Sequence, residues 1–189
     1  MNDRYQNKYR IKSARHPGWD YGWNAAYFVT ICTKDRACWF GDVMQGEMRL
    51  SSIGEIALQC WLEIPEHFPF VELGNHIIMP NHVHGIVIIN KKDDEFYDKH
   101  NVETQNFASL PRTSNEPKNQ FGPQSKNLAS IIRGVKIGVT KNARLINPDF
   151  AWQPRYHDHI IRNEKSYHTI SEYIVENPQK WSEDKFYTP

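Results

Sequence analysis

Two histidines separated by one residue, His82 and His84, are the first residues of this chain whose types and spacing suggest chemistry. They open an apolar run that reads as a β-strand, and alternate side chains of a strand lie on one face of its sheet. Two imidazoles on one rigid face form half of a metal site, although structural or surface histidines can have the same spacing. The chain has no HExxH motif and no CxxC pair, so the common zinc hydrolase templates do not apply.

Two polar residues of the last expected helix offer further ligand chemistry. Tyr173 and Asn177 are four residues apart, on a helix face shared with Ile170 and Ile174 that should point toward the sheet. An amide oxygen and two imidazoles suit Mg²⁺ or Mn²⁺, with positions left for water or a phosphate oxygen. A tyrosine on the neighbouring turn would be poised to attack that phosphate. The alternative is a tyrosine at the edge of the core and an Asn-Pro pair that ends the helix.

Length and composition limit the possible functions. The 189 residues suit one domain, 1–189, that is large enough to bury a sizeable core. A formal net charge of +1 gives no overall attraction to nucleic acid, so DNA binding must depend on a local arrangement of Lys and Arg. Three cysteines without a CxxC pair argue against a disulfide framework, and no stretch is long and apolar enough to span a membrane. We therefore expect a cytoplasmic protein without membrane association.

The elements that position the candidate residues follow from sequence periodicity. Strands are predicted at 26–33, 70–79, 83–89 and 150–161, with a small hairpin that joins 38–40 to 48–50. Helices are predicted at 52–64, around 128–144 and at 165–177, and the tail at 179–189 is expected to be irregular. This order predicts an α+β sandwich of ferredoxin-like or RRM-like topology, with helices packed on a central antiparallel sheet.

Two segments differ in composition from these elements. Residues 91–126 are polar, contain three prolines and have no sustained period, which predicts a mobile loop inserted within the domain. Residues 1–23 form an N-terminal arm in which basic and aromatic residues alternate, and such an arm can follow a phosphate backbone and stack bases. A polar tail whose aromatic side chains dock onto the core is the alternative for this arm.

Five stretches in order resemble the HUH single-tyrosine transposases, and the nearest branch is that of the REP-associated tyrosine transposases. They are AYFVTICT, MPNHVHGIVII, SIIRGVKIGVTK, WQPRYHDHIIRNEKSY and YIVENPQKW. The likeness covers about residues 27–181 apart from the loop after Asn90. His82 and His84 match the two histidines of the superfamily signature, which flank a hydrophobic residue. Tyr173 matches the nucleophile and Asn177 the third metal ligand, where the insertion-sequence branch more often has Gln.

This resemblance implies a transposase that cuts and rejoins single-stranded or hairpin DNA with Mg²⁺ or Mn²⁺ as cofactor. Tyr173 would attack a phosphodiester and leave a 5′-phosphotyrosine link and a free 3′-hydroxyl. A second 3′-hydroxyl could reverse the step, so neither ATP nor water is consumed. His82, His84 and Asn177 would hold the metal. The enzyme would act as a monomer or as a homodimer that exchanges the tyrosine helix.

The same resemblance assigns DNA-phosphate contacts to five cations, of which three form a stripe on one helix and two flank the last strand: Arg133, Lys136, Arg144, Arg155 and Arg162. Without the resemblance, the stripe is typical of a solvated helix face. Two rival functions stay open. A non-catalytic module of RRM-like fold would hold single strands on its sheet without metal. A metal-dependent phosphodiesterase would attack with bound water and form no protein–DNA adduct.

Overall fold

The computed structural model describes residues 18–91 and 126–187 of the chain. The predicted loop at 91–126, apart from its two end residues, lies outside the described residues, and so do residues 1–17 of the predicted N-terminal arm. Within the described ranges, no helix combines the length and the apolar character needed to cross a bilayer.

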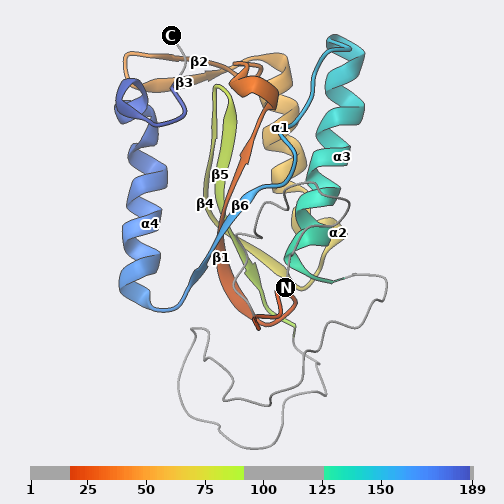
Figure 1. Cartoon of the computed structure of the whole chain (residues 1–189), viewed down its shortest axis with the longest axis vertical. Coiled ribbons are helices and arrows are strands. Elements are labelled where there is room, and N and C mark those ends of the chain that lie inside the picture. The colour runs from red at the N-terminus through yellow and green to blue at the C-terminus, as the bar shows by residue number, and fades with distance from the viewer. Residues whose placement is uncertain (1–17, 92–125, 188–189) are drawn as a thin grey trace, which may run out of the picture.

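A four-stranded antiparallel sheet forms the centre of the described chain (Figure 1). Its strands are β1 (Ala25–Cys32), β4 (Val71–Met79), β5 (His82–Ile89) and β6 (His157–Ile161), in the spatial order β4-β5-β1-β6. Because β1 pairs with both β5 and β6, the first strand lies inside the sheet. The predicted α+β fold with a central antiparallel sheet is confirmed.

Helices cover both faces of this sheet. In Figure 1, α1 (Ser52–Leu62), α2 (Ile64–His67) and α3 (Leu128–Ile146) lie on one side of the strands, and α4 (Glu164–Glu176) lies on the other. The larger hydrophobic core fills the side of α1 and α3, which pack against each other. A smaller core joins α4 to the opposite face.

The alternation of side chains along β5 assigns its residues to the two faces. Val83 and Val87 belong to the larger core, whereas Ile86 belongs to the smaller core beneath α4. His82 and His84 lie four and two positions before Ile86, so they point to the same face as Ile86. The two histidines therefore lie on the face that α4 covers.

The predicted strand at 38–40 is wrong. The hairpin forms instead between β2 (Gly41–Met44) and β3 (Glu47–Leu50), with Gln45 and Gly46 at the turn and φ angles of 55° and 78°. Two successive residues with positive φ form the tight turn that best suits the twist of a hairpin. Phe40, whose type favoured a strand, is fully buried in the larger core instead.

The first helical region differs from the single helix predicted at 52–64, because α1 ends at Leu62 and the short helix α2 follows it. The Ser51 side chain accepts a hydrogen bond from the Gly54 backbone N–H at 3.1 Å and caps the start of α1. Pro65 lies in the first turn of the short helix α2, where the missing proline N–H has no helical partner to lose.

The predicted strand at 150–161 is too long. Only its last five residues form β6, and Trp152 makes an isolated bridge to Thr33. Between them, Arg155 has a left-handed φ of 67°, which interrupts the extended backbone.

The tail at 179–189 is predicted to be irregular, but part of it is helical. After α4 the chain continues as the 3-10 helix η3 (Asn177–Glu183), and Trp181 of this helix is buried. The chain then returns toward the start of β5, where the ring of Phe186 lies 4.7 Å from the ring of His82. This return brings C-terminal residues to the two histidines.

Candidate active site

His82 and His84 are almost completely removed from solvent, with 0% and 1% of their surfaces exposed. Their rings lie 4.4 Å apart on the face that α4 covers. Across the sheet, His84 pairs with Thr30 of β1, and His84 Nδ1 lies 2.9 Å from Thr30 Oγ1. This contact fixes the orientation of the His84 ring and leaves its Nε2 atom pointing away from β1 toward α4.

Asn81 orients the other imidazole. His82 Nδ1 donates to Asn81 Oδ1 at 2.9 Å, while Asn81 Nδ2 donates to the carbonyl oxygens of Arg36 and Phe186 at 3.1 and 2.7 Å. These two donations fix which end of the amide carries oxygen, so the proton of the neutral His82 ring lies on Nδ1. His82 Nε2 is then left as a lone-pair donor.

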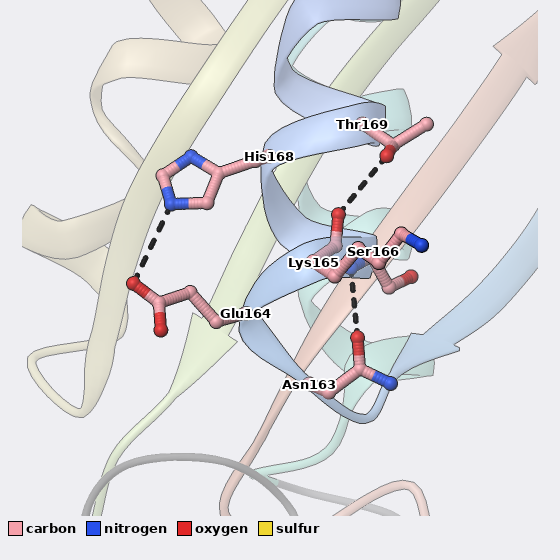
Figure 2. Close-up of polar contacts among 6 residues, drawn as sticks. All are labelled: Asn163, Glu164, Lys165, Ser166, His168 and Thr169. Atoms are coloured by element: carbon pink, nitrogen blue, oxygen red, sulfur yellow. Dashed lines mark hydrogen bonds and ion pairs between the residues drawn. The ribbon is translucent and has the colours of Figure 1, made fainter.

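The start of α4 sets the helical register of the residues that face these histidines. Asn163 Oδ1 accepts a hydrogen bond from the Ser166 backbone N–H at 2.8 Å, which caps the helix (Figure 2). Ile174 is fully buried against the sheet in the smaller core. Tyr173 precedes it and Asn177 follows α4 directly, so both lie at the end of the helix nearest to the histidines.

The structure brings Tyr173 and Asn177 to the histidine pair. The Tyr173 hydroxyl lies 3.2 Å from His84 Nε2, and its ring packs against those of His84 and Phe28. Asn177 is only 2% exposed, whereas Tyr173 is 39% exposed. The tyrosine therefore lies between the buried histidines and solvent.

Asp184 also belongs to this cluster, and the sequence reasoning missed it. Its Oδ2 atom accepts hydrogen bonds from the Tyr173 hydroxyl and from Asn177 Nδ2, both at 3.4 Å. His82, His84 and Asp184 each offer a ligand atom within 4.8 Å of the others, so this group could hold a metal ion. The sequence feature that could have identified Asp184 is an acidic residue between the aromatic residues Trp181 and Phe186.

The donor set fits a divalent ion. Within the described residues, His82 Nε2 and Asn177 Oδ1 are both buried without a hydrogen-bond partner. Such an atom costs about 1–3 kcal/mol when it is left unpaired, and coordination would satisfy both. Two imidazole nitrogens, an amide oxygen and a carboxylate suit Mn²⁺, and the two oxygens also suit Mg²⁺.

Burial controls the protonation states in this cluster. It lowers the pKa of His82 to about 3, and the nearby Lys185 and Arg36 lower it as well. Burial also lowers the pKa of His84 well below its usual value. Both imidazoles are therefore neutral at pH 7, as metal ligands must be. Burial and the Asp184 carboxylate raise the pKa of Tyr173, so its hydroxyl keeps its proton in the metal-free protein.

The five cations predicted to contact DNA lie on α3 and around β6. Arg133, Lys136 and Arg155 line an open cavity of about 400 Å³ beside α3. Arg144 Nε donates to the Phe150 carbonyl at 3.1 Å, and Arg162 is exposed just after β6. Three of the five thus share one cavity, while the histidine cluster is built by β5, α4 and η3.

Comparison with known proteins gives two relatives and one informative structure. An uncharacterized protein of Haemophilus influenzae is 39% identical over 178 residues, which cover 93% of this chain and 92% of that protein. A second Haemophilus influenzae protein, named "Putative REP-associated tyrosine transposase", is 24% identical over 162 residues, which cover 85% of this chain and 74% of its own. No protein-family model matches the chain.

One solved structure that is similar to this chain is that of a REP-associated tyrosine transposase bound to a REP hairpin. It aligns with a TM-score of 0.55 and 21% sequence identity, over 89% of this chain and 73% of that one. The present chain therefore has the fold of a REP-associated tyrosine transposase and belongs to the same family as the uncharacterized Haemophilus influenzae protein.

Proposed function

We propose that this protein is a metal-dependent enzyme that cuts and rejoins single-stranded DNA of hairpin or repeat type, through a 5′-phosphotyrosine link to Tyr173. The observation that carries the proposal is the Tyr173 hydroxyl, 3.2 Å from His84 Nε2 at the edge of a buried ligand cluster. The substrate class is supported by the transposase of the same fold, which is bound to a REP hairpin.

His82, His84, Asn177 and Asp184 would hold Mg²⁺ or Mn²⁺. When bound, the ion would supply positive charge that neutralises a phosphate and polarises its phosphorus. The protein contributes a rigid set of donors, because Thr30 and Asn81 orient the two rings. The ligands are therefore positioned before DNA arrives.

Tyr173 is the group that DNA can reach. Its partial exposure contrasts with the burial of both histidines and Asn177, so a phosphodiester can approach the hydroxyl from solvent. An ionised carboxylate has about four acceptor sites, so Asp184 can face an ion and still accept the Tyr173 proton. Asp184 would then serve both as a ligand and as the proton acceptor.

The proposed step is a transesterification that conserves the phosphodiester. As the Tyr173 proton moves to Asp184, the phenolic oxygen forms a bond to phosphorus and the bond from phosphorus to the 3′-oxygen breaks. The leaving 3′-oxygen takes up a proton from solvent and becomes a free 3′-hydroxyl, while Asp184 holds the phenolic proton. Attack by a second 3′-hydroxyl reverses the step and joins new ends, so no nucleotide cofactor is required.

A single chain supplies all of these groups. Tyr173, on α4, reaches His84, on β5 of the same chain. We therefore propose that the enzyme acts in cis as a monomer, although a homodimer that exchanges α4 would assemble the same contacts.

The test is a search for a covalent protein–DNA adduct. The protein would be incubated with end-labelled hairpin DNA and Mn²⁺ or Mg²⁺, then separated on a denaturing gel. We expect a labelled band at the mass of the protein plus DNA, which is lost with EDTA and in Tyr173→Phe. Cleavage without an adduct would support the water-dependent phosphodiesterase instead. Metal-independent binding without cleavage of several hairpins would support the non-catalytic module.

A further inference from the structure

Two exposed cations outside the predicted set, Arg36 and Lys185, lie beside the histidine cluster. We propose that Arg36 and Lys185 form a phosphate-binding pair that holds the backbone of the DNA strand beside Tyr173. This inference rests on the proposed function, because it assigns a substrate contact to the same site.

The ring of Phe186 connects this pair to the histidines. It lies 4.7 Å from the ring of His82 and 6.0 Å from that of His84. Lys185 Nζ lies 4.7 Å from the centroid of Phe186, and the Arg36 guanidinium carbon lies 5.3 Å from it. Both cations therefore contact the ring that packs against the two histidines.

The main chain around Arg36 is held in an unusual conformation. Asp35 and Arg36 have left-handed φ angles of 53° and 56°, a backbone conformation that non-glycine residues rarely adopt. Arg36 Nη1 donates to the Lys185 carbonyl at 2.7 Å, and Asn81 donates to the Arg36 carbonyl. The same Asn81 orients His82, so one buried amide fixes both a ligand and the loop that carries Arg36. Strained residues held in this way are concentrated at functional sites.

Positive charge is concentrated beside this cluster. The formal net charge is only +1, yet two cations lie beside a cluster whose one acidic member is Asp184. A local positive field in a nearly neutral protein attracts a polyanion to one place. An arginine can bind a phosphate with two parallel hydrogen bonds, and a lysine adds a point charge.

Two of the cations on α3 are engaged with the protein itself. Lys136 Nζ donates to the carbonyl oxygens of Gln153 and Arg155 at 2.7 and 2.5 Å. Arg144 holds the Phe150 carbonyl. These contacts stabilise the segment between α3 and β6.

The salt dependence of DNA binding tests the pair without any catalysis. Single-stranded hairpin DNA would be titrated into the Tyr173→Phe protein without divalent metal, at several salt concentrations. Each lost phosphate contact should reduce the slope of log K against log salt by about 0.7. We expect this reduction for Lys185→Gln and for Arg36→Gln. Arg36→Lys keeps the positive charge, so its slope should equal that of the protein with both cations. Lys180→Gln is the matched control, because Lys180 is an exposed neighbour that pairs with Glu176 at 2.6 Å.

Mn²⁺ affinity separates a contact with DNA from a structural role. If Arg36 only braces the segment that carries Asp184, Arg36→Gln will weaken Mn²⁺ binding and leave the salt slope unchanged. If it binds phosphate, Mn²⁺ affinity will stay the same or increase, since a nearby positive charge has been removed.

Two results would contradict the proposal that Arg36 and Lys185 bind DNA phosphates. One is a salt slope in Lys185→Gln equal to that of Lys180→Gln. Another is an unchanged slope together with faster adduct formation when either substitution is made in the protein that keeps Tyr173, which would make the C-terminal segment a cover over the site. A wild-type protein that forms no adduct would refute the proposed function, while the slopes would still report whether the pair binds DNA.

Discussion

The Tyr173 hydroxyl lies 3.2 Å from Nε2 of His84, a residue 89 positions earlier in the chain. This contact joins the exposed end of α4 to the buried start of β5. The buried histidines are thereby connected to a side chain that is 39% exposed, which is where we propose that the substrate reacts.

Asp184→Asn should weaken Mn²⁺ binding. The substitution keeps the shape of the side chain but removes the negative charge that both Tyr173 and Asn177 contact. We expect the dissociation constant to increase by about 10–100-fold or more, as for the loss of groups around other metal sites. Isothermal titration calorimetry would measure it, with Glu183→Gln as the adjacent control. Equal affinity in the two variants would remove Asp184 from the ligand set.

Thr30→Val should weaken Mn²⁺ binding with little loss of stability. Valine has nearly the same shape, but it cannot form the 2.9 Å contact that orients His84. We expect a dissociation constant about tenfold higher and a free energy of unfolding lower by about 1 kcal/mol. Thr140→Val, which loses a hydroxyl on α3, is the control. If Thr30→Val binds Mn²⁺ as tightly as this control, the hydroxyl does not position the ring.

The metal-free protein should become less stable as the pH falls below about 6.5. Burial lowers the pKa of His82 to about 3 and that of His84 well below its usual value. The unfolded chain takes up a proton at each histidine near pH 6.5, whereas the folded protein keeps both rings neutral. Their contribution is therefore constant above this pH and decreases below it, by up to about 1.4 kcal/mol per pH unit for each histidine.

Urea unfolding in EDTA at a series of pH values would measure this slope. His168→Gln should leave it unchanged, because the His168 side chain is 67% exposed and pairs with Glu164 on the surface of α4 (Figure 2). A free energy of unfolding that stays constant between neutral pH and about pH 5 would show that the histidines take up protons in the folded protein.

The parts of this structure that depend on local periodicity could be predicted from the sequence. Alternation along β5 places His82 and His84 on one face, and the spacing of Tyr173 and Asn177 places them at one end of α4. Their catalytic and ligand roles are still proposals. The fold class followed from the order of the elements, which the sheet confirms.

The missed features depend on contacts between distant residues. Asp184 reaches the cluster only because η3 turns the chain back, with Trp181 buried and Phe186 packed on His82. No local pattern in the tail indicates that packing. The first strand of the hairpin was predicted too early because Phe40 has a high strand propensity, whereas its side chain is buried in the core. The turn itself depends on the backbone angles of Gln45 and Gly46.

The central claim is that Tyr173 becomes covalently linked to DNA, and mass spectrometry of the adduct tests it most directly. After cleavage of hairpin DNA with Mn²⁺, nuclease and trypsin digestion would leave a nucleotide on the peptide at 166–180, which contains both Tyr167 and Tyr173. We expect fragmentation to place the added phosphate on Tyr173. An adduct on Tyr167 or on another peptide, or DNA cleavage with no modified tyrosine, would contradict the account.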